Sequence, residues 1–255
     1  MTDLSGRAAV VTGAGSGIGR AVALRLARAG ARVAFLGRRR APLEAAAAEA
    51  KGGGYVRSVD VRDRADVERA FEDVAHHLGP LHVVVANAGT GGPDVASGVD
   101  RYDEIVRTNL DGAYFCLRAF ERHLAPGPEM RCAVVVSSCV ARFGVPGIAA
   151  YSAAKAGQLG LVRSLAAELA PRGVRVNAIC PGWVETEMAQ QRMREIAAEL
   201  GRDYESVRRE LVAAVPLQRI SEPEEIAGLV EFLCSPDAAG FTGQTFDPNN
   251  GAWMG

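Results

Sequence analysis

Short hydrophobic runs alternate with longer amphipathic stretches along most of this chain of 255 residues. The runs predict strands over Ala8–Val11, Ala31–Leu36, Tyr55–Val59, His82–Ala86, Ala133–Ser137, Arg175–Ile179 and Gln244–Phe246. The stretches between them predict helices over Arg20–Ala29, Ala41–Lys51, Arg64–Leu78, Arg101–Ala125, Ser152–Pro171 and Pro223–Cys234. Such alternation is typical of parallel βαβ units. We therefore expect one doubly wound α/β domain over residues 1–255, with about seven strands and helices on both faces of the sheet.

Most of these strands are followed by a glycine, a proline or a small polar residue. The residues in question are Thr12, Gly37, Asp60, Asn87, Ser138 and Pro181. Right-handed crossovers put the carboxyl ends of parallel strands along one edge of the sheet, where ligands of such sheets bind. We expect these residues to line a single cleft.

The first strand runs directly into the glycine-rich segment Thr12-Gly13-Ala14-Gly15-Ser16-Gly17-Ile18-Gly19, which is followed by a helical pattern. In a strand–turn–helix of this kind, backbone N–H groups and the helix N-terminus face an anion. The glycines do not fit G-x-G-x-x-G, because Ile18 stands where the third glycine would be needed. They fit T-G-x-x-x-G-x-G instead. This layout favours a nucleotide site over a plain glycine-rich turn.

Three further residues indicate acid–base chemistry. Tyr151 and Lys155 are four residues apart, and Ser138 lies thirteen residues before the tyrosine. On a helix, positions i and i+4 share one face, so the phenol and the ammonium can converge. A phenol has an ordinary pKa of about 10, and a neighbouring cation shifts that pKa toward neutrality. We expect Tyr151 to act as the acid or base and Ser138 to hold a substrate oxygen.

Together these residues resemble the short-chain dehydrogenase/reductase family of the tyrosine-dependent type, in particular its 3-oxoacyl-(acyl-carrier-protein) reductase-like members. The resemblance covers nearly the whole chain. It rests on Thr12 to Gly19, Asp60-Val61, Asn87-Ala88-Gly89, Asn109, Ser138, Tyr151, Lys155 and Pro181-Gly182, in that order. Two departures are Ala86, where the family often has asparagine, and Asn249-Asn250-Gly251, where a Gly-Gly pair is common. The resemblance implies a Rossmann-like fold and NAD(P)-dependent hydride transfer between nicotinamide and a ketone or secondary alcohol.

The resemblance also implies which residues contact the cofactor. They are Gly13, Ser16, Gly17, Ile18, Gly19, Asp60, Val61, Asn87, Ala88, Gly89, Tyr151, Lys155, Pro181, Gly182, Val184 and Thr186. Asp60 and Val61 would flank the adenine, and Thr186 would hold the nicotinamide carboxamide. As structural alternatives, Asp60 could cap its own turn and Pro181-Gly182 could be an ordinary turn.

The end of the second strand bears on the choice between NADP and NAD. It reads Gly37-Arg38-Arg39-Arg40, with no carboxylate before Glu44. An acidic residue here suits the ribose hydroxyl of NAD, whereas guanidinium groups suit the 2′-phosphate of NADP. Arg38 and Arg39 therefore favour NADP(H). NAD(H) remains possible because Ser16 is neutral and Gly37 leaves room for a bare ribose. The arginines could also be a solvated helix start.

In the mechanism that the resemblance implies, Tyr151 protonates the carbonyl oxygen and Ser138 donates a hydrogen bond to it. Lys155 lowers the tyrosine pKa and binds the nicotinamide ribose. Asn109 would continue a proton relay toward Lys155, or it is a buried residue whose side chain bonds to the backbone. Asparagine has a low helix propensity, which favours a polar task within the expected helix.

Three segments should border the substrate: 91–95, 140–148 and a lid at about 183–216. The lid contains the helical patterns Met188–Leu200 and Glu205–Val215. Arg142 could attract an acidic or phosphopantetheine-bearing substrate, or it is a surface residue. The expected substrate contacts are Ser138, Val140, Phe143, Tyr151, Trp183 and Met188.

A 3-oxoacyl thioester or polyketide-type ketone, small or bound to an acyl carrier, is the leading substrate class. A polyol, sugar or hydroxysteroid is the competing class. A non-catalytic nucleotide-binding scaffold is disfavoured because all three catalytic residues are present.

Composition and charge bear on whether the protein binds nucleic acid, membranes or metals and whether it is secreted. The formal net charge is −1, so nothing drives the chain toward nucleic acid, and no segment is apolar enough for a membrane. The five cysteines and four histidines have no metal-binding spacing, and the first residues lack a signal-peptide core. We expect a cytoplasmic protein with reduced cysteines and no metal. The resemblance further implies a homotetramer, consistent with small residues on the expected helix Ser152–Pro171.

Overall fold

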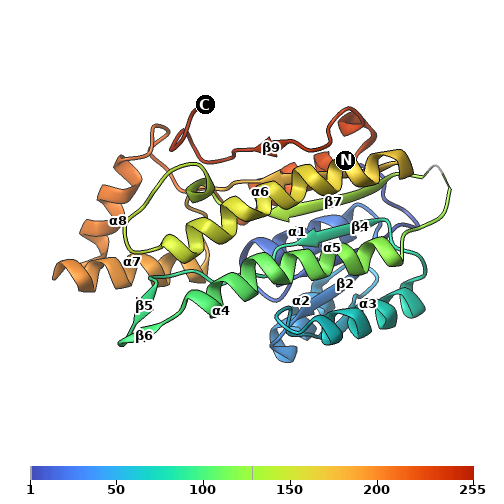
Figure 1. The fold of residues 1–255 in the computed structure, drawn as a ribbon, viewed down its shortest axis with the longest axis horizontal. Coiled ribbons are helices and arrows are strands. Elements are labelled where there is room, and N and C mark those ends of the chain that lie inside the picture. Colours follow the sequence, from blue (N-terminus) through green and yellow to red (C-terminus); the bar gives the residue numbers. More distant parts are fainter. Residues whose placement is uncertain (1, 128) are drawn as a thin grey trace.

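The computed structural model describes residues 2–127 and 129–255. Seven parallel strands form one sheet in the order β3-β2-β1-β4-β7-β8-β9 (Figure 1). Their bounds are β1 Ala8–Thr12, β2 Arg32–Gly37, β3 Tyr55–Ser58, β4 Val83–Ala86, β7 Arg131–Val136, β8 Val174–Ile179 and β9 Thr245–Phe246. The predicted doubly wound sheet is confirmed.

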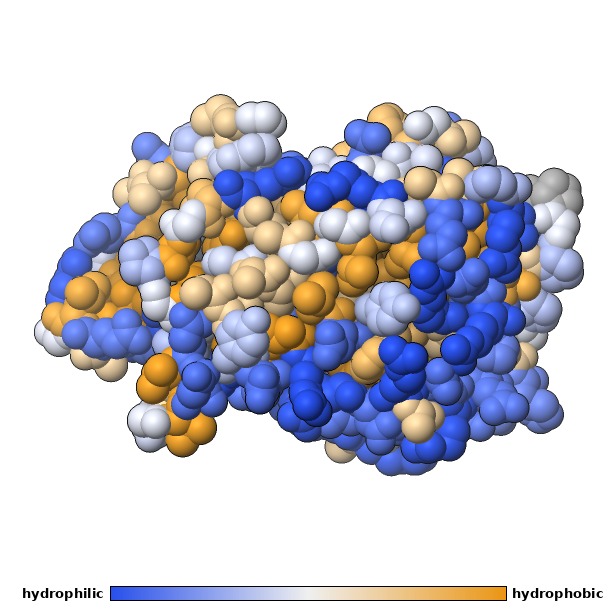
Figure 2. Space-filling view, viewed as in Figure 1, coloured by the Kyte–Doolittle hydropathy of each residue, from blue (hydrophilic) through white to orange (hydrophobic). Residues whose placement is uncertain are grey.

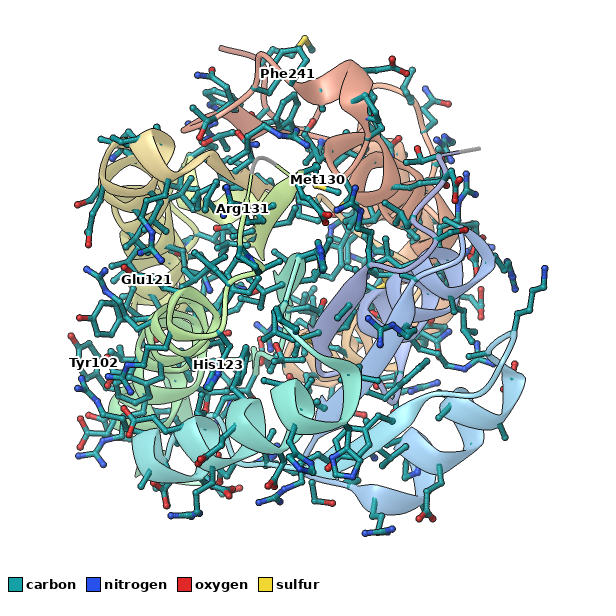
Figure 3. The ribbon with its side chains drawn as sticks, turned by 90° about the vertical axis from the view of Figure 1, so that its right-hand side faces the viewer. Tyr102, Glu121, His123, Met130, Arg131 and Phe241 are labelled. Carbon is teal, nitrogen blue, oxygen red and sulfur yellow. The ribbon has the colours of Figure 1, made fainter. Side chains whose placement is uncertain are left out.

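Helices cover both faces of the sheet. They are α1 Gly17–Arg28, α2 Arg40–Glu49, α3 Arg64–Leu78, α4 Tyr102–Val106, α5 Gly112–Arg122, α6 Ala149–Leu169, α7 Glu187–Leu200, α8 Tyr204–Ala213 and α9 Pro223–Leu233. Successive strand residues point to opposite faces. Val10 accordingly packs in the core under α3, α5 and α6, whereas Val11 packs under α1, α2 and α9. Figure 3 shows the two helical layers on either side of the sheet, with Arg131 at the start of β7 between them.

The order of the strands fixes where a ligand can bind. The chain moves outward from β1 through β2 to β3, then returns to β4 on the other side of β1 and continues through β7 and β8. The loops after β1 and β4 therefore leave the sheet in opposite directions. This switch point opens a crevice at the carboxyl ends of the strands.

Several helix boundaries differ from the prediction. The predicted helix Arg101–Ala125 is divided by a π-helical segment, Arg107–Asp111, between α4 and α5. Such wide turns often occur at functional sites. Helix α6 begins at Ala149, three residues earlier than predicted, which places Tyr151 in its first turn. Pro171 lies in a short 3₁₀ turn after α6.

A small hairpin, β5 (Val95–Ala96) and β6 (Val99–Asp100), was not predicted. Its turn is Ser97-Gly98, and both residues have positive φ, 51° and 76°. That pair of left-handed residues matches a tight two-residue hairpin turn. The hairpin projects from the body of the protein below α7 in Figure 1.

Helices α7 and α8 form the segment expected to be a lid and extend beyond the sheet at the left of Figure 1. Gly201, at φ +62°, ends α7, and the Asp203 side chain caps α8 by accepting from the Ser206 N–H at 3.0 Å. Among the helices of the described residues, none combines the length and the hydropathy needed to cross a membrane.

Candidate active site

The glycine-rich turn joins β1 to α1 by close backbone packing. Gly13 and Gly17 have positive φ, +67° and +50°, a conformation that side chains disfavour. A Cβ on Gly19 would lie 2.3 Å from the Gly13 carbonyl oxygen and 2.4 Å from the Asn87 amide nitrogen. Only glycine fits there, so the turn brings the N-terminus of α1 to the crevice.

Thr12 and Asn87 tie the two strands at the switch point together. The Thr12 hydroxyl oxygen accepts hydrogen bonds from the N–H groups of Asn87 and Ala88, both at 3.0 Å. The Asn87 amide in turn donates to the Thr12 carbonyl at 2.9 Å. The Asn87-Ala88-Gly89 segment is thus a brace for the floor of the crevice.

A cavity of about 580 Å³ occupies the crevice. It brings together most of the predicted site residues: Gly13, Ser16, Gly17, Ile18, Gly19, Arg38, Arg39, Asp60, Val61, Asn87, Ala88, Gly89, Asn109, Tyr151, Lys155, Thr186 and Met188. The sequence did not point to Pro42, Leu43, Thr90, Gln191 and Arg194, which also line it. Gln191 and Arg194 follow Met188 at intervals of three residues on α7. Such spacing marks one helix face and could have revealed them.

Other predicted residues are not part of the lining of this cavity: Ser138, Val140, Phe143, Pro181, Gly182, Trp183 and Val184. Ser138 caps the 3₁₀ turn Cys139–Ala141. Gly182 packs against the backbone of Asn249, since an added Cβ would lie 3.0 Å from the Asn249 Cα. Phe143 is exposed, and Val184 pairs with Ser221 in an isolated bridge.

Ser138, Tyr151 and Lys155 converge at one end of the cavity. The Ser138 hydroxyl lies close enough to the Tyr151 phenol to lower its pKa. Lys155 is buried, and its ammonium donates to the Val136 carbonyl at 2.8 Å and lies 5.6 Å from the centre of the Tyr151 ring. Two of the three ammonium donors are left for the cavity. The three groups can therefore act on one substrate oxygen.

Burial controls the protonation of both titratable groups. Desolvation raises the pKa of Tyr151 to about 12, and the nearby Ser138 hydroxyl offsets this only in part. Desolvation also lowers the pKa of Lys155 to about 8. Loss of water around the phenol is the largest cause of the raised tyrosine pKa, so the expected lowering by Lys155 stays a prediction.

Asn109 is fully buried in the π-helical segment, and all its side-chain bonds go to backbone. The amide donates to the carbonyls of Thr90 and Ile105, both at 2.8 Å, and its oxygen accepts from the Thr90 N–H at 3.2 Å. Both amide hydrogens are thus in use, which matches the structural alternative for this residue. The Asn109 main-chain oxygen accepts from the Gln158 amide at 2.7 Å.

Comparisons with known proteins agree with this geometry. The family model described as enoyl-(acyl carrier protein) reductase matches residues 13–252. The chain belongs to the short-chain dehydrogenase/reductase family. It is 37% identical to a Streptomyces virginiae protein assigned as the monensin polyketide synthase ketoacyl reductase, over 97% of each chain. It is 33% identical to the Escherichia coli 3-oxoacyl-(acyl-carrier-protein) reductase FabG, over 99% of each chain.

A solved structure of a single-residue variant of the actinorhodin polyketide ketoreductase with NADPH is similar over 99% of each chain, with a TM-score of 0.89 and 32% identity. These likenesses assign the chain to NAD(P)-dependent oxidoreductases that interconvert ketone and alcohol groups. The cavity fits a bound dinucleotide. Its glycine turn admits no Cβ at Gly19, and its far end carries two guanidinium groups.

The arginines after β2 differ in their surroundings. Arg40 forms an ion pair with Glu44 at 2.7 Å on the surface of α2. Arg38 and Arg39 line the cavity and form no ion pair with any carboxylate of the described residues. Two of the three guanidinium groups therefore line the cavity without forming an ion pair, and the charge of Arg38 acts on the nearby Asp60 carboxylate.

Asp60 also lies at this end of the short-chain dehydrogenase site. Its carboxylate pairs with Arg62 at 2.6 Å and accepts from the Arg62 N–H at 3.0 Å. These hydrogen bonds lower the pKa of Asp60. The side chain therefore stabilises its own turn, as in the structural alternative, while the residue still lines the cavity.

Arg142 does not serve as a free cation for an acidic substrate, which corrects one of the two readings from the sequence. Its guanidinium pairs with Asp247 through two hydrogen bonds, of 3.2 and 3.0 Å, and stacks on Trp253 at 4.7 Å. The contact joins the loop after Ser138 to the C-terminal segment. A desolvated, stacked and doubly bonded guanidinium has little capacity left for a ligand.

The departure at Asn249-Asn250-Gly251 also has a structural role. Asn250 has φ +56°, and its amide donates to the Ser221 hydroxyl at 2.9 Å and to the Arg219 carbonyl at 3.3 Å. Its main-chain oxygen accepts from the Leu217 N–H at 3.1 Å. Asn250 thus fastens the segment that follows α8 to the C-terminal segment.

All five cysteines are free thiols, and one of them, Cys139, is next to Ser138 in the chain. Burial raises the pKa of Cys139, so that this thiol stays protonated. Within the part of the chain that the structure describes, no group of three or more histidine, cysteine or acidic side chains could hold a metal ion.

Proposed function

We propose that this chain is an NADPH-preferring ketoreductase that acts on 3-oxoacyl thioesters or polyketide-type ketones, with Tyr151 as the proton donor. The observation that supports it best is the arrangement of charge along one cavity. The Tyr151 phenol beside Ser138 and the Lys155 ammonium lie at one end. The guanidinium groups of Arg38 and Arg39, which form no ion pair among the described residues, lie at the other.

The bound nicotinamide would supply the hydride. The glycine turn, Asp60 and Val61, and Thr186 would hold the cofactor, with Arg38 and Arg39 on the adenosine phosphate. In ketone reduction the Tyr151 hydroxyl gives its proton to the carbonyl oxygen, and the Ser138 hydroxyl fixes that oxygen by a hydrogen bond. The Lys155 ammonium supplies positive charge as the phenolate forms.

Exposed apolar side chains in the segments predicted to border the substrate support a substrate with an acyl or polyketide chain. The large hydrophobic side chains exposed on the surface include Val95, Phe143, Val145, Met188 and Leu200. All five lie in the three segments predicted to border the substrate. A polyol or sugar would instead need a rim of hydrogen-bonding groups. The curated relatives named above, a ketoacyl reductase and a 3-oxoacyl-(acyl-carrier-protein) reductase, favour the same class and an acyl-carrier-bound substrate.

The lid, the assembly and the location complete the proposal. Helices α7 and α8, within residues 183–216, would close over the substrate and exclude water. Ala153, Ala156 and Gly160 are exposed along α6, which lies beside α5 on the outer face in Figure 1. The same face shows pale and apolar residues in its centre (Figure 2). Such small residues permit close contact between helices of two subunits, so the proposal includes a homotetramer. It also includes a cytoplasmic location.

The test is turnover by the purified protein with a panel of ketones and both reduced nicotinamides. Acetoacetyl thioesters with NADPH should react fastest. The reaction is monitored by the decrease in absorbance of the reduced cofactor. The panel should include polyols, sugars and hydroxysteroids with oxidised cofactor, and a 2-enoyl thioester. Tyr151→Phe should lose at least about 100-fold in turnover while still binding NADPH. Preference for an enoyl thioester or a polyol, or unchanged turnover in Tyr151→Phe, would refute the proposal.

A further inference from the structure

The catalytic helix α6 has no capping side chain of its own. Tyr151 lies in its first turn, where backbone N–H groups have no partner within the helix. The residue before the helix is Ile148, which has no polar side chain, whereas serine, threonine, aspartate or asparagine usually caps such a turn. An uncapped first turn would fray, and the phenol would move with it.

Asp94 supplies the missing cap from a distant part of the chain. Its two carboxylate oxygens accept hydrogen bonds from the N–H groups of Ala149 at 2.7 Å and Ala150 at 2.9 Å. Its own N–H donates to the Gly147 carbonyl at 2.8 Å. A carboxylate here also faces the positive end of the helix dipole. Both residues that Asp94 binds on α6 directly precede Tyr151.

The loop that carries Asp94 is itself held in place. The Arg101 N–H donates to the Asp94 carbonyl at 2.8 Å. The Arg101 guanidinium donates to the Gly91 carbonyl at 3.2 Å and pairs with Glu104 at 3.0 Å. Asp94 is therefore a fixed anchor rather than a mobile surface carboxylate.

The same loop lies close to the Tyr151 ring. A Cβ placed on Gly91 would lie 3.9 Å from the Tyr151 ring and 3.6 Å from the sulfur of Met188 on α7. One short segment, Gly91–Asp94, thus lies close to the phenol and to the expected lid and binds the start of α6. The sequence also predicts that this segment borders the substrate.

We propose that Asp94 is a positioning residue for ketone reduction. It holds the first turn of α6 so that the Tyr151 hydroxyl keeps its place beside Ser138 and Lys155. The inference rests on the proposed role of Tyr151, but the cap itself can be measured without turnover.

The main variant is Asp94→Ala, and its matched control is Asp100→Ala. Asp100 ends β6, six residues after Asp94, and among the described residues its carboxylate accepts only from the local Tyr102 N–H, at 2.8 Å. Asp94→Ala should lower kcat for ketone reduction about 10- to 100-fold, because small displacements of a catalytic group are costly, and should leave the Kd for NADPH within about twofold. Asp100→Ala should leave kcat unchanged. Asp94→Asn keeps one acceptor and should recover part of the loss.

Amide hydrogen exchange gives the second measurement. In Asp94→Ala the amides of Ala149, Ala150 and Tyr151 should exchange faster, while those of the later turns of α6 keep their protection. Unchanged exchange, or faster exchange with unchanged kcat, would overturn the inference. So would equal losses of kcat in Asp94→Ala and Asp100→Ala. If the wild type reduces none of the ketones, the proposed function fails, and exchange still decides whether Asp94 is the cap.

Discussion

The ammonium of Lys155 lies 5.6 Å from the centre of the Tyr151 ring, and its observed hydrogen bond goes to the Val136 carbonyl. Both side chains are desolvated, with opposite effects on their protonation. The pKa of Lys155 is lowered to about 8, whereas the pKa of Tyr151 is raised to about 12. At neutral pH the phenol is therefore protonated and the lysine charged, which is the state that ketone reduction needs.

The pH dependence of kcat/KM follows from these values. Below pH 8 both groups are in the active state, and the rate of reduction should be constant. As the pH rises through about 8, Lys155 loses its proton and the rate should fall about tenfold per unit. Tyr151 does not cause this fall in rate, because its phenol keeps its proton until about pH 12. Steady-state kinetics between pH 5 and pH 10, at about unit intervals, would measure it.

Lys155→Arg is the control for this assignment. The guanidinium keeps its charge across the whole range, so any activity that remains should lack the fall near pH 8. If kcat/KM of the wild type stays constant up to pH 10, another group controls the rate. The same conclusion follows if kcat/KM of Lys155→Arg still falls near pH 8.

Cofactor choice can be tested with two neighbouring arginines. Arg38 lines the cavity, whereas Arg40 is paired with Glu44 on the surface. Loss of a hydrogen bond between charged groups costs about 1.5–3 kcal/mol, so Arg38→Ala should raise the KM for NADPH about 10- to 150-fold. The KM for NADH should change much less, and Arg40→Ala should change neither. Steady-state kinetics with both cofactors would measure this. A wild-type preference for NADH, or equal effects on both cofactors, would contradict the role of Arg38.

The attachment of the expected lid to the C-terminal segment can be tested at Asn250. Its amide donors hold Ser221 and Arg219, and its φ of +56° suits glycine. Asn250→Gly should therefore fold well but loosen the segment after α8, because the donors are lost and the backbone is relaxed. Limited proteolysis within residues 187–213 should become faster, and the KM for the ketone should rise about threefold.

Asn250→Asp is the matched variant, since it keeps the size of the side chain and tolerates the left-handed backbone but cannot donate. It loses the bond to the Arg219 carbonyl but can accept from the Ser221 hydroxyl, so it should loosen the lid less than glycine does. Wild-type cleavage rates in both variants would show that the Asn250 amide does not restrain the lid.

The sheet and most of the site could be predicted because their signals are local. A strand, the glycine turn and the start of α1 are consecutive in the sequence, and the spacing of Tyr151 and Lys155 follows from helix geometry. Gly19 and Asn87 belong to motifs that fix the crevice by backbone contact, and such contacts leave a recognisable pattern of residues.

The parts that could not be predicted depend on contacts between distant segments. Arg142 pairs with Asp247, 105 residues later, and Asp94 caps a helix that begins 55 residues later. Nothing beside either residue in the sequence marks its partner. The raised pKa of Tyr151 is missed for the same reason, because desolvation depends on the complete fold.

The glycine turn gives the most direct test of the cofactor site. A Cβ on Gly19 would lie 2.3 Å from the Gly13 oxygen, so Gly19→Ala must displace the turn from β1. NADPH binding should weaken by at least about 100-fold, because the backbone donors no longer face the phosphates. The fluorescence of the reduced cofactor measures this binding.

Gly228→Ala is the control, because it makes the same change within α9, where an added Cβ has no heavy atom within 4 Å among the described residues. Alanine is the better helix former, so this variant should be more stable by about 0.5–1 kcal/mol and bind NADPH normally. Thermal unfolding of both variants separates a local effect on the turn from general destabilisation. If Gly19→Ala bound NADPH as tightly as the wild type, the close packing at Gly19 would not be required for the cofactor site.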